Sequence, residues 1–294
     1  MVPRLSVSQI TTLSSSFAED VRAYRVAGFD GIGVWELKLP DGSDAEPLEL
    51  LAESGLASAA AIPAAPSILP LPLLGGPEDP AERIDAYCRS VERLAPFGPT
   101  GLVLLTGSGQ GRDLDEARAI VVDGLETIAA AAEDAGVRVG IEPYQRHGGE
   151  EWTIVSSIPE AVELIHDAGD PPSLGIQFDT WHVWNTDTLY EDIERELDRF
   201  VGVHVSDTRE PTRGWADRVF AGEGRGDVAR ILAALDAAGW AGLYDIEIFS
   251  DDGTFGDEFP DSYWAQPAAE TLRRARAAFE RCFTPHPQTA EETR

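Results

Sequence analysis

The sequence contains few cysteines, no long apolar run and few basic residues. Its two cysteines, Cys88 and Cys282, lie far apart without CxxC spacing, so neither a disulfide framework nor a thiolate metal site is expected. No run of about 20 apolar residues occurs, which argues against a membrane span. The first residues lack the basic and apolar segments of a signal peptide, so we expect a strand there and a cytoplasmic protein.

Basic residues are outnumbered more than twofold by acidic ones. The chain has 23 Lys and Arg residues against 52 Asp and Glu residues, a net charge of −29. Such a surface repels phosphate backbones and anionic lipid head groups, so neither nucleic acid nor a membrane is expected as a partner. Most of the acidic residues are expected on a solvated surface, and acidity of this kind does not by itself indicate a metal site.

Short apolar runs alternate with longer helix-like stretches along the chain. Near-continuous apolar runs of this length are typical of parallel strands buried on both faces. Eight runs are expected to be strands: Arg4–Ser8, Gly31–Trp35, Ala57–Ile62, Gly101–Leu105, Arg138–Glu142, Leu174–Asp179, Val201–Val205 and Leu243–Glu247.

Amphipathic helices are expected between these strands. In Asp113–Ala135 and Asp227–Ala238, apolar residues recur at spacings of three and four, which predicts a stripe that packs against a sheet. Several helix-like stretches end in a glycine followed by an apolar residue, and glycine accepts the left-handed conformation that ends a helix. These glycines are Gly28, Gly55, Gly136 and Gly239.

The repeated helix–glycine–strand unit predicts an α/β fold, a single-domain (β/α)8 TIM barrel over residues 1–284. The stretch Ile62–Pro80 is rich in proline and glycine, and we expect it to fold over the barrel mouth rather than to link two domains. Residues 285–294 are polar and are expected to form a flexible tail.

Ionisable side chains stand at or near the ends of four consecutive predicted strands. Because the active site of a barrel collects at the C-terminal ends of its strands, we expect Glu142, Asp179, His204 and Glu247 to converge. One such residue alone is more often structural, but three converging carboxylates repel one another unless a cation joins them. The set therefore predicts one divalent metal, and its ligand types suit Mn²⁺, Mg²⁺, Zn²⁺ or Co²⁺.

Other residues near the strand ends are candidates for substrate contacts. His182 follows Asp179 by three residues and is expected to face the substrate or to orient a ligand. His147 follows the fifth strand, where it is either a general acid or base or an exposed loop histidine. Arg218 precedes a glycine-containing loop and is suited to hold a hydroxyl, carboxylate or phosphate oxygen.

Tryptophans also gather near the predicted strand ends. Trp35 and Trp181 are expected to contact the substrate, because apolar ring faces stack on sugar rings. The same rings equally well form the wall of any pocket.

These motifs together resemble the xylose isomerase-like barrel superfamily and, within it, the sugar phosphate isomerase/epimerase family. The resemblance covers roughly Arg4 to Cys282. It is carried by IEP at Ile141–Pro143, FDTWH at Phe178–His182, VHVSD at Val203–Asp207, DIEIF at Asp245–Phe249, and an arginine with two glycines from Arg218 to Gly224.

The resemblance implies a metal centre and a reaction. One divalent metal, with Mn²⁺ expected first, is held by Glu142, Asp179, His204 and Glu247, while His182 and Arg218 contact the substrate. Glu142 and Glu247 then form the acid/base pair, one removing a proton beside a carbonyl and the other returning one. The expected function is isomerisation or epimerisation of a keto-sugar or related polyol, by a homo-oligomer that binds a small carbohydrate.

Two other functions stay open. The long segment Glu247–Trp264 is similar to the catalytic subunits of C-glycoside deglycosidases, lyases that cleave 3-oxo-C-glycosides and pair with a small β-rich subunit. In that interpretation His147 becomes the leading acid/base residue. An elimination like that of inosose dehydratases is a further lyase alternative. The remaining alternative is a non-catalytic sugar-binding barrel. An endonuclease IV-type site is not expected, because no histidine precedes His147.

Overall fold

The computed structural model describes residues 2–72, 74–109, 111–145 and 152–283. Its strands form one parallel sheet in the order β3-β2-β1-β11-β8-β7-β6-β5-β4. The strands are β1 (Arg4–Ser8), β2 (Gly31–Gly33), β3 (Ala57–Ser58), β4 (Ala60–Ala61), β5 (Gly101–Leu104), β6 (Val139–Ile141), β7 (Leu174–Asp179), β8 (Phe200–Val205) and β11 (Leu243–Ile246). Each of the eight predicted strand regions is confirmed.

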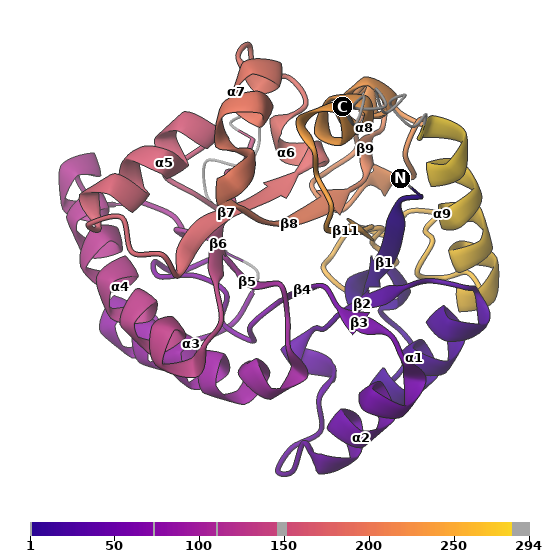
Figure 1. Cartoon of the computed structure of the whole chain (residues 1–294), viewed down its shortest axis with the longest axis horizontal. Helices are drawn as coiled ribbons and strands as arrows, with labels where there is room; N and C mark the ends of the chain where they lie inside the picture. The colour runs from indigo at the N-terminus through magenta and orange to yellow at the C-terminus, as the bar shows by residue number, and fades with distance from the viewer. Residues whose placement is uncertain (1, 73, 110, 146–151, 284–294) are drawn as a thin grey trace, which may run out of the picture.

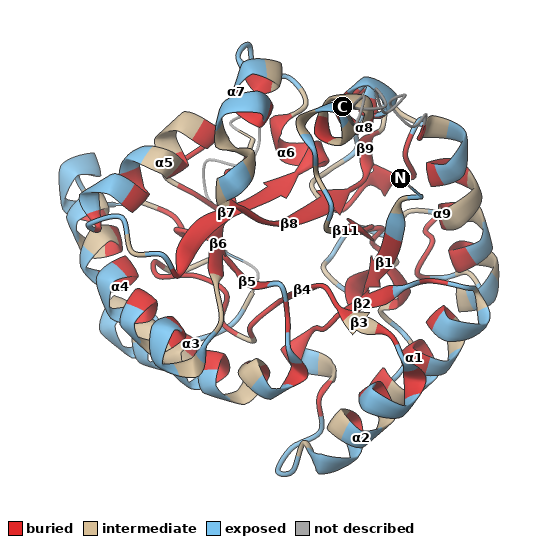
Figure 2. Cartoon of the chain, in the orientation of Figure 1, coloured by how far each residue is buried: buried red, intermediate tan, exposed pale blue. Residues whose placement is uncertain are grey.

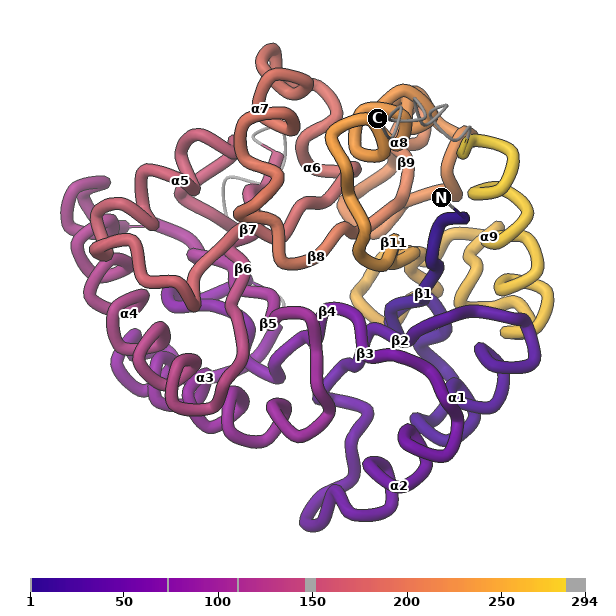
Figure 3. Tube along the Cα trace, in the orientation of Figure 1, coloured from indigo at the N-terminus to yellow at the C-terminus, as the bar shows by residue number. Residues whose placement is uncertain are grey.

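The sheet closes into a barrel because β3 and β4 are two halves of one segment. Ala59 lies between them; its N–H donates to the carbonyl of Ile32, and its carbonyl accepts from the N–H of Thr100. The two edges of the sheet are therefore joined through a single residue, and Figure 3 shows the chain closing the ring there. The predicted (β/α)8 barrel is confirmed, with its third strand kinked.

Helices surround this ring, as Figure 1 shows. They are α1 (Phe17–Val26), α2 (Ala45–Ser54), α3 (Pro80–Leu94), α4 (Leu114–Ala135), α5 (Ile158–Asp167), α6 (Thr180–Val183), α7 (Leu189–Glu196), α8 (Val228–Ala238) and α9 (Ala268–Cys282). Two short strands, β9 (Asp207–Thr208) and β10 (Arg218–Val219), pair antiparallel between β8 and α8. None of the described helices is long and apolar enough to cross a membrane.

Local sequence explains where the helices begin and end. Ser16 and Glu19 form a reciprocal capping box at the start of α1, and Asp113 caps α4 by accepting from the N–H of Asp115. All four predicted glycine ends are confirmed by positive φ angles: Gly28 79°, Gly55 74°, Gly136 69° and Gly239 101°. Each turn returns the chain to the next strand.

Burial follows the predicted layers. Figure 2 shows buried strands inside and helices whose outward faces are exposed. On α4, the predicted stripe Val121, Leu125 and Ile128 is fully buried. Burying one such side chain contributes about 1.5–3 kcal/mol, so this stripe fixes the helix on the barrel and leaves the strand ends to carry the site.

Candidate metal centre

The four predicted ligands lie together at one end of the barrel. Asp179 ends β7 and His204 lies in β8, while Glu142 and Glu247 directly follow β6 and β11. These strands are neighbours in the order β11-β8-β7-β6, and Asp179 stands in register with His204. One ligand atom of each residue lies within 4.8 Å of those of the other three, and all four residues are buried.

A network of polar contacts links the cluster. Nδ1 of His204 lies 3.3 Å from Oε1 of Glu142 and 3.4 Å from Oε2 of Glu247. Nη1 of Arg218 donates to Oδ2 of Asp179 and to Oε2 of Glu247, at 2.8 Å each. The guanidinium thus lies directly beside two carboxylates of the cluster.

The donor set fits a divalent cation. Three carboxylates and one Arg218 guanidinium sum to a charge of −2, which a divalent ion neutralises when His204 is uncharged. Ligands at about 2.1 Å from one ion lie at most about 4.2 Å apart, so the four atoms need only small side-chain movements to share an ion. Oxygen and imidazole donors without thiolate suit Mn²⁺, Mg²⁺, Co²⁺ and Zn²⁺ alike.

Burial and neighbouring charges shift the pKa values of the cluster. Burial raises the pKa of Glu142 to about 7, against the opposing effect of His204. Burial also raises the pKa of Asp179, but the charges of Arg218, His182 and His204 together outweigh it and hold that pKa below its ordinary value. Burial lowers the pKa of His204, yet Glu247 and Glu142 outweigh it and raise that pKa to about 10. The protein without metal therefore holds His204 protonated at neutral pH.

His182 lies beside the cluster, as predicted from its spacing to Asp179. Its Nε2 is 3.5 Å from Oδ2 of Asp179 and 3.4 Å from Nη2 of Arg218. Its ring centroid lies 3.5 Å from that of Tyr144, and burial holds the pKa of the imidazole well below its ordinary value. Nδ1 of His182 has no hydrogen-bond partner among the described residues, so the neutral ring keeps one nitrogen free.

A small cavity that is partly open to solvent adjoins the cluster. Its polar lining consists of Glu142, Arg218 and Glu247. Its other lining side chains are aromatic or aliphatic: Trp35, Ile62, Pro66, Leu74, Val103, Leu105, Tyr144, Trp152, Trp215 and Phe249. The stretch Ile62–Pro80 thus contributes to the wall, which confirms its predicted place at the mouth.

The two predicted tryptophan contacts lie in different places. Trp35 lines the cavity and is 3% exposed, and its indole N–H has no acceptor among the described residues. Trp181 is not part of the described lining; its ring lies against Arg218, with Cζ 4.7 Å from the ring centroid. Phe249 packs on the same guanidinium at 4.6 Å, so Arg218 is held by two rings as well as by two carboxylates.

Two loops form the outer wall of the cavity. The loop between β9 and β10 carries Trp215, whose ring packs at 5.0 Å from Trp152 and at 5.4 Å from Phe249. The segment after β11 pairs with this loop, because the N–H of Asp251 donates to the carbonyl of Ala216. The acidic and aromatic segment Glu247–Trp264 therefore packs over the site.

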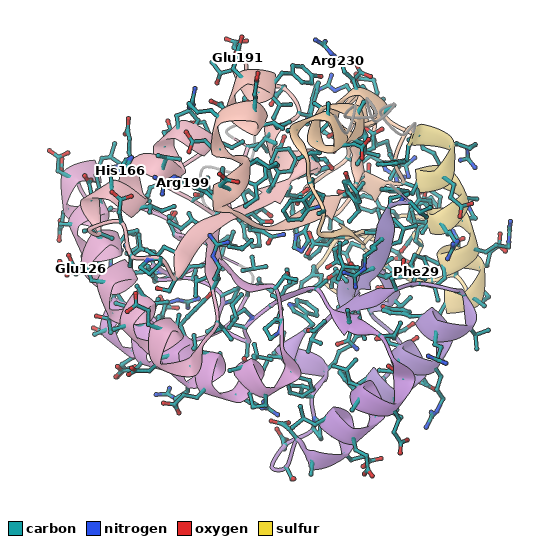
Figure 4. All side chains as sticks on the ribbon, in the orientation of Figure 1. Phe29, Glu126, His166, Glu191, Arg199 and Arg230 are labelled. Carbon is teal, nitrogen blue, oxygen red and sulfur yellow. The ribbon has the colours of Figure 1, made fainter. Side chains whose placement is uncertain are left out.

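Of the three remaining histidines, only His166 lies among the described residues. His147 falls within 146–151 and His286 within 284–294, both outside the described residues. Figure 4 places His166 on the outside of the helix layer, where its Nδ1 contacts Asp170 at 2.6 Å. His166 is therefore remote from the metal cluster.

Sequence reasoning missed several residues of the site. Tyr144, Trp152 and Phe249 line the cavity, and Asp245 lies beneath His204. A signal existed for two of them: Asp245 and Phe249 flank Glu247 at a spacing of two, which places all three side chains on one side of an extended segment. Trp152 lies far beyond its strand, so no strand-end rule could place it.

Comparisons with known proteins identify related sequences. A 3-dehydroshikimate dehydratase of Pseudomonas putida is 27% identical over 253 residues, which cover 82% of this chain and 37% of that protein. An inosose isomerase of Bacillus licheniformis is 24% identical over 166 residues, 55% of this chain and 54% of that protein. The chain thus spans about a third to a half of the length of these curated relatives.

Solved structures share the whole fold. A Sinorhizobium meliloti protein has a TM-score of 0.84 and 26% identity, over 96% of this chain and 99% of its own. The IolI protein with a bound zinc atom has a TM-score of 0.75 and 21% identity, over 95% and 97%. The model of the xylose isomerase-like TIM barrel family matches residues 21–280. With that match over most of its length, the chain belongs to the xylose isomerase-like TIM barrel family.

Proposed function

We propose that this protein is a divalent-metal-dependent enzyme that removes a proton next to the carbonyl of a keto-sugar or related polyol. The observation that carries the proposal is the convergence of Glu142, Asp179, His204 and Glu247 beside a cavity that Glu142 and Glu247 line. All four positions carry a residue that can bind a metal, which argues against a barrel that binds sugar but catalyses no reaction. Mn²⁺ is the proposed metal; Mg²⁺, Co²⁺ and Zn²⁺ fit the same donors.

The side chains around the cavity divide the chemical tasks. The bound metal supplies Lewis-acid polarisation of the carbonyl and stabilises the negative charge that develops. Glu142 and Glu247 both line the cavity, so one carboxylate takes the proton and the other returns it. Arg218 holds a substrate oxygen, and neutral His182 offers a hydrogen bond beside it. Trp35 provides an apolar face for the ring of the substrate.

Reprotonation on the opposite face or on the adjacent carbon makes the enzyme an epimerase or isomerase, the reaction class that we favour. The inosose isomerase relatives support this choice. Elimination is the second candidate, because two 3-dehydroshikimate dehydratases align with 82% of the chain. Both outcomes begin with the same deprotonation and separate only when the intermediate either regains a proton or expels a leaving group.

Metal analysis and matched substitutions test the shared first step. We expect about one divalent ion per chain, activity on a panel of ketoses and cyclic keto-polyols, and loss of that activity with a chelator. Glu142→Gln and Glu247→Gln should each lower kcat at least about 10³-fold, since each removes a ligand and a proton-transfer group. The control is Glu126→Gln, the same change at an exposed position of α4. Wild-type turnover in either active-site variant would remove that residue from the mechanism.

Isotope and product analysis separates the two reaction classes. In ²H₂O an epimerase or isomerase incorporates deuterium without loss of water, whereas a lyase releases water or an aglycone.

His147→Ala should impair elimination much more than epimerisation, since that histidine is proposed as the acid for a leaving group. Co-purification decides the proposed assembly: a homo-oligomer accompanies the epimerase, and a small β-rich subunit accompanies a C-glycoside deglycosidase.

A further inference from the structure

Asp245 is a buried carboxylate that the proposed chemistry does not use. It lies within β11 and is 1% exposed. Neither of its oxygens has a hydrogen-bond partner among the described residues. The nearest residue in register on β1, Ser6, directs its hydroxyl to the carbonyl of Tyr244 at 3.5 Å. A buried carboxylate without a hydrogen bond disfavours folding, so its presence calls for an explanation in function.

The strands around Asp245 are arranged to accommodate this carboxylate. A Cβ at Gly33, on β2, would collide with Oδ2 of Asp245, so glycine at that position leaves the space that the carboxylate fills. On the other side, β8 places His204 in register with Asp245. Oδ2 of Asp245 lies 3.7 Å from Nε2 of His204, on the side of the ring opposite to the ligand cluster.

The two nitrogens of His204 therefore face different groups. Nδ1 faces Glu142 and Glu247, whereas Nε2 faces Asp245 and has no hydrogen-bond partner among the described residues. A histidine that binds a metal through Nδ1 must carry its proton on Nε2. A buried N–H of this kind needs an acceptor, and a carboxylate acceptor fixes both the tautomer and the ring orientation.

We propose that Asp245 is a positioning residue that accepts the Nε2–H of His204 and so holds this ring with Nδ1 directed at the metal. The inference rests on the proposed function, because it assigns Asp245 a role only in a protein that binds metal. This role also explains why β2 has a glycine at position 33, where a Cβ would collide with the carboxylate, and why a carboxylate is buried two residues before Glu247.

Metal affinity of the apoprotein tests this role without measuring turnover. Titration calorimetry with Mn²⁺ should show a Kd about 10–100-fold weaker in Asp245→Ala than in the wild type. Asp245→Asn keeps the shape and one acceptor oxygen, so its Kd should lie between the two. The matched control is Gln177→Met, which changes another buried interior polar side chain without hydrogen-bond partners, on β7, and should leave the Kd within about threefold.

Two further readouts separate positioning from a purely structural role. Thermal unfolding of the metal-free Asp245→Asn variant should remain cooperative, so that a weaker Kd reports on the metal site and not on loss of the fold. The Nε2–H of His204 in the Zn²⁺-loaded protein should give a downfield ¹H NMR signal, as expected for a hydrogen bond to a carboxylate, and this signal should move upfield in Asp245→Ala. A wild-type Kd in both Asp245 variants, or an equal loss of affinity in Gln177→Met, would overturn the inference. A wild-type protein that binds no metal would overturn the proposed function with it.

Discussion

Arg218 supplies positive charge to the carboxylate cluster from within the chain. Its Nη1 donates to Asp179 and Glu247, and the rings of Trp181 and Phe249 pack against its guanidinium. Loss of one partner from a buried ion pair costs about 3–5 kcal/mol, because it leaves the other charges uncompensated. Arg218 is therefore a structural counter-charge as well as the proposed substrate contact.

The variant Arg218→Met tests the role of this arginine as a counter-charge. We expect the metal-free variant to lose about 3–5 kcal/mol of unfolding free energy, and saturating Mn²⁺ to restore part of it because the ion replaces the lost charge. Arg218→Lys should lose less unfolding free energy, since lysine keeps the positive charge but lacks the guanidinium that donates to both carboxylates. Urea denaturation with and without metal measures both. Equal losses with and without Mn²⁺ would show that the ion does not compensate for the arginine.

The pH dependence of metal binding follows from His204. Without metal its pKa is raised to about 10, so Nδ1 carries a proton at neutral pH that must leave before it can bind an ion. Metal affinity should therefore rise with pH between 6 and 9, by up to about tenfold per unit for each proton released. Calorimetry in two buffers of different protonation enthalpy counts the protons. An affinity independent of pH would contradict the assignment of His204 as a ligand.

At this scale the sequence predicted the cluster of candidate ligands, which the structure brings together, but not the residues packed around it. The four candidates could be identified because the active site of a barrel collects at the C-terminal ends of its strands. They are Glu142, Asp179, His204 and Glu247. Asp245 was missed because a carboxylate inside an apolar strand has no role until the facing residue on β8 is known. Contacts between strands depend on register, which hydrophobic patterns leave undetermined.

Among the elements, the loop that leads into α8 depends on one buried carboxylate. Asp207 accepts from the backbone N–H groups of Gly222, Gly224 and Gly226 at 3.0, 3.1 and 2.7 Å, and it is 1% exposed. This clamp fixes the loop that directly follows β10, the strand on which Arg218 lies. The glycines of the sequence motif are therefore donors to a clamp, whereas the sequence alone suggested only a tight turn.

Asp207→Asn tests this clamp. An amide retains one acceptor and turns an NH₂ group toward backbone donors, so we expect a loss of about 2–4 kcal/mol in unfolding free energy. Asp123→Asn makes the same change on the exposed face of α4 and should cost less than about 0.5 kcal/mol. Chemical denaturation compares the two. A loss in Asp207→Asn no greater than in Asp123→Asn would show that the clamp is not needed for stability.

Helix ends and strand regions were predictable because short-range chemistry determines them, as the positive φ angles of Gly55 and Gly136 illustrate. The kink at Ala59 was not predictable, since Ala57–Ile62 is uniformly small and apolar. That kink depends on the need to pair with β2 on one side and β5 on the other. Closure of the ring is a property of the whole sheet, so the residues of one segment do not predict it.

The whole molecule carries a large excess of negative charge. Its net charge of −29 arises from 52 acidic and 23 basic residues, and such self-repulsion destabilises a compact state. Salt screens repulsion between exposed charges, since the screening length falls from about 30 Å at 0.01 M to about 3 Å at 1 M. Tm should therefore rise by a few degrees between low and moderate NaCl, with roughly 2–4 °C corresponding to 1 kcal/mol in a large domain.

Choline chloride at matched ionic strength is the control for this measurement, because its cation is too large for the ligand cluster. Equal increases in Tm with both salts would show that screening of the surface charge is responsible. An increase confined to NaCl would indicate a bound cation instead, and a fall in Tm with both salts would mean that the ion pairs of the surface outweigh its repulsion. Scanning calorimetry of the metal-free protein distinguishes these outcomes, since a divalent ion in the buried site would otherwise dominate the stability of the barrel.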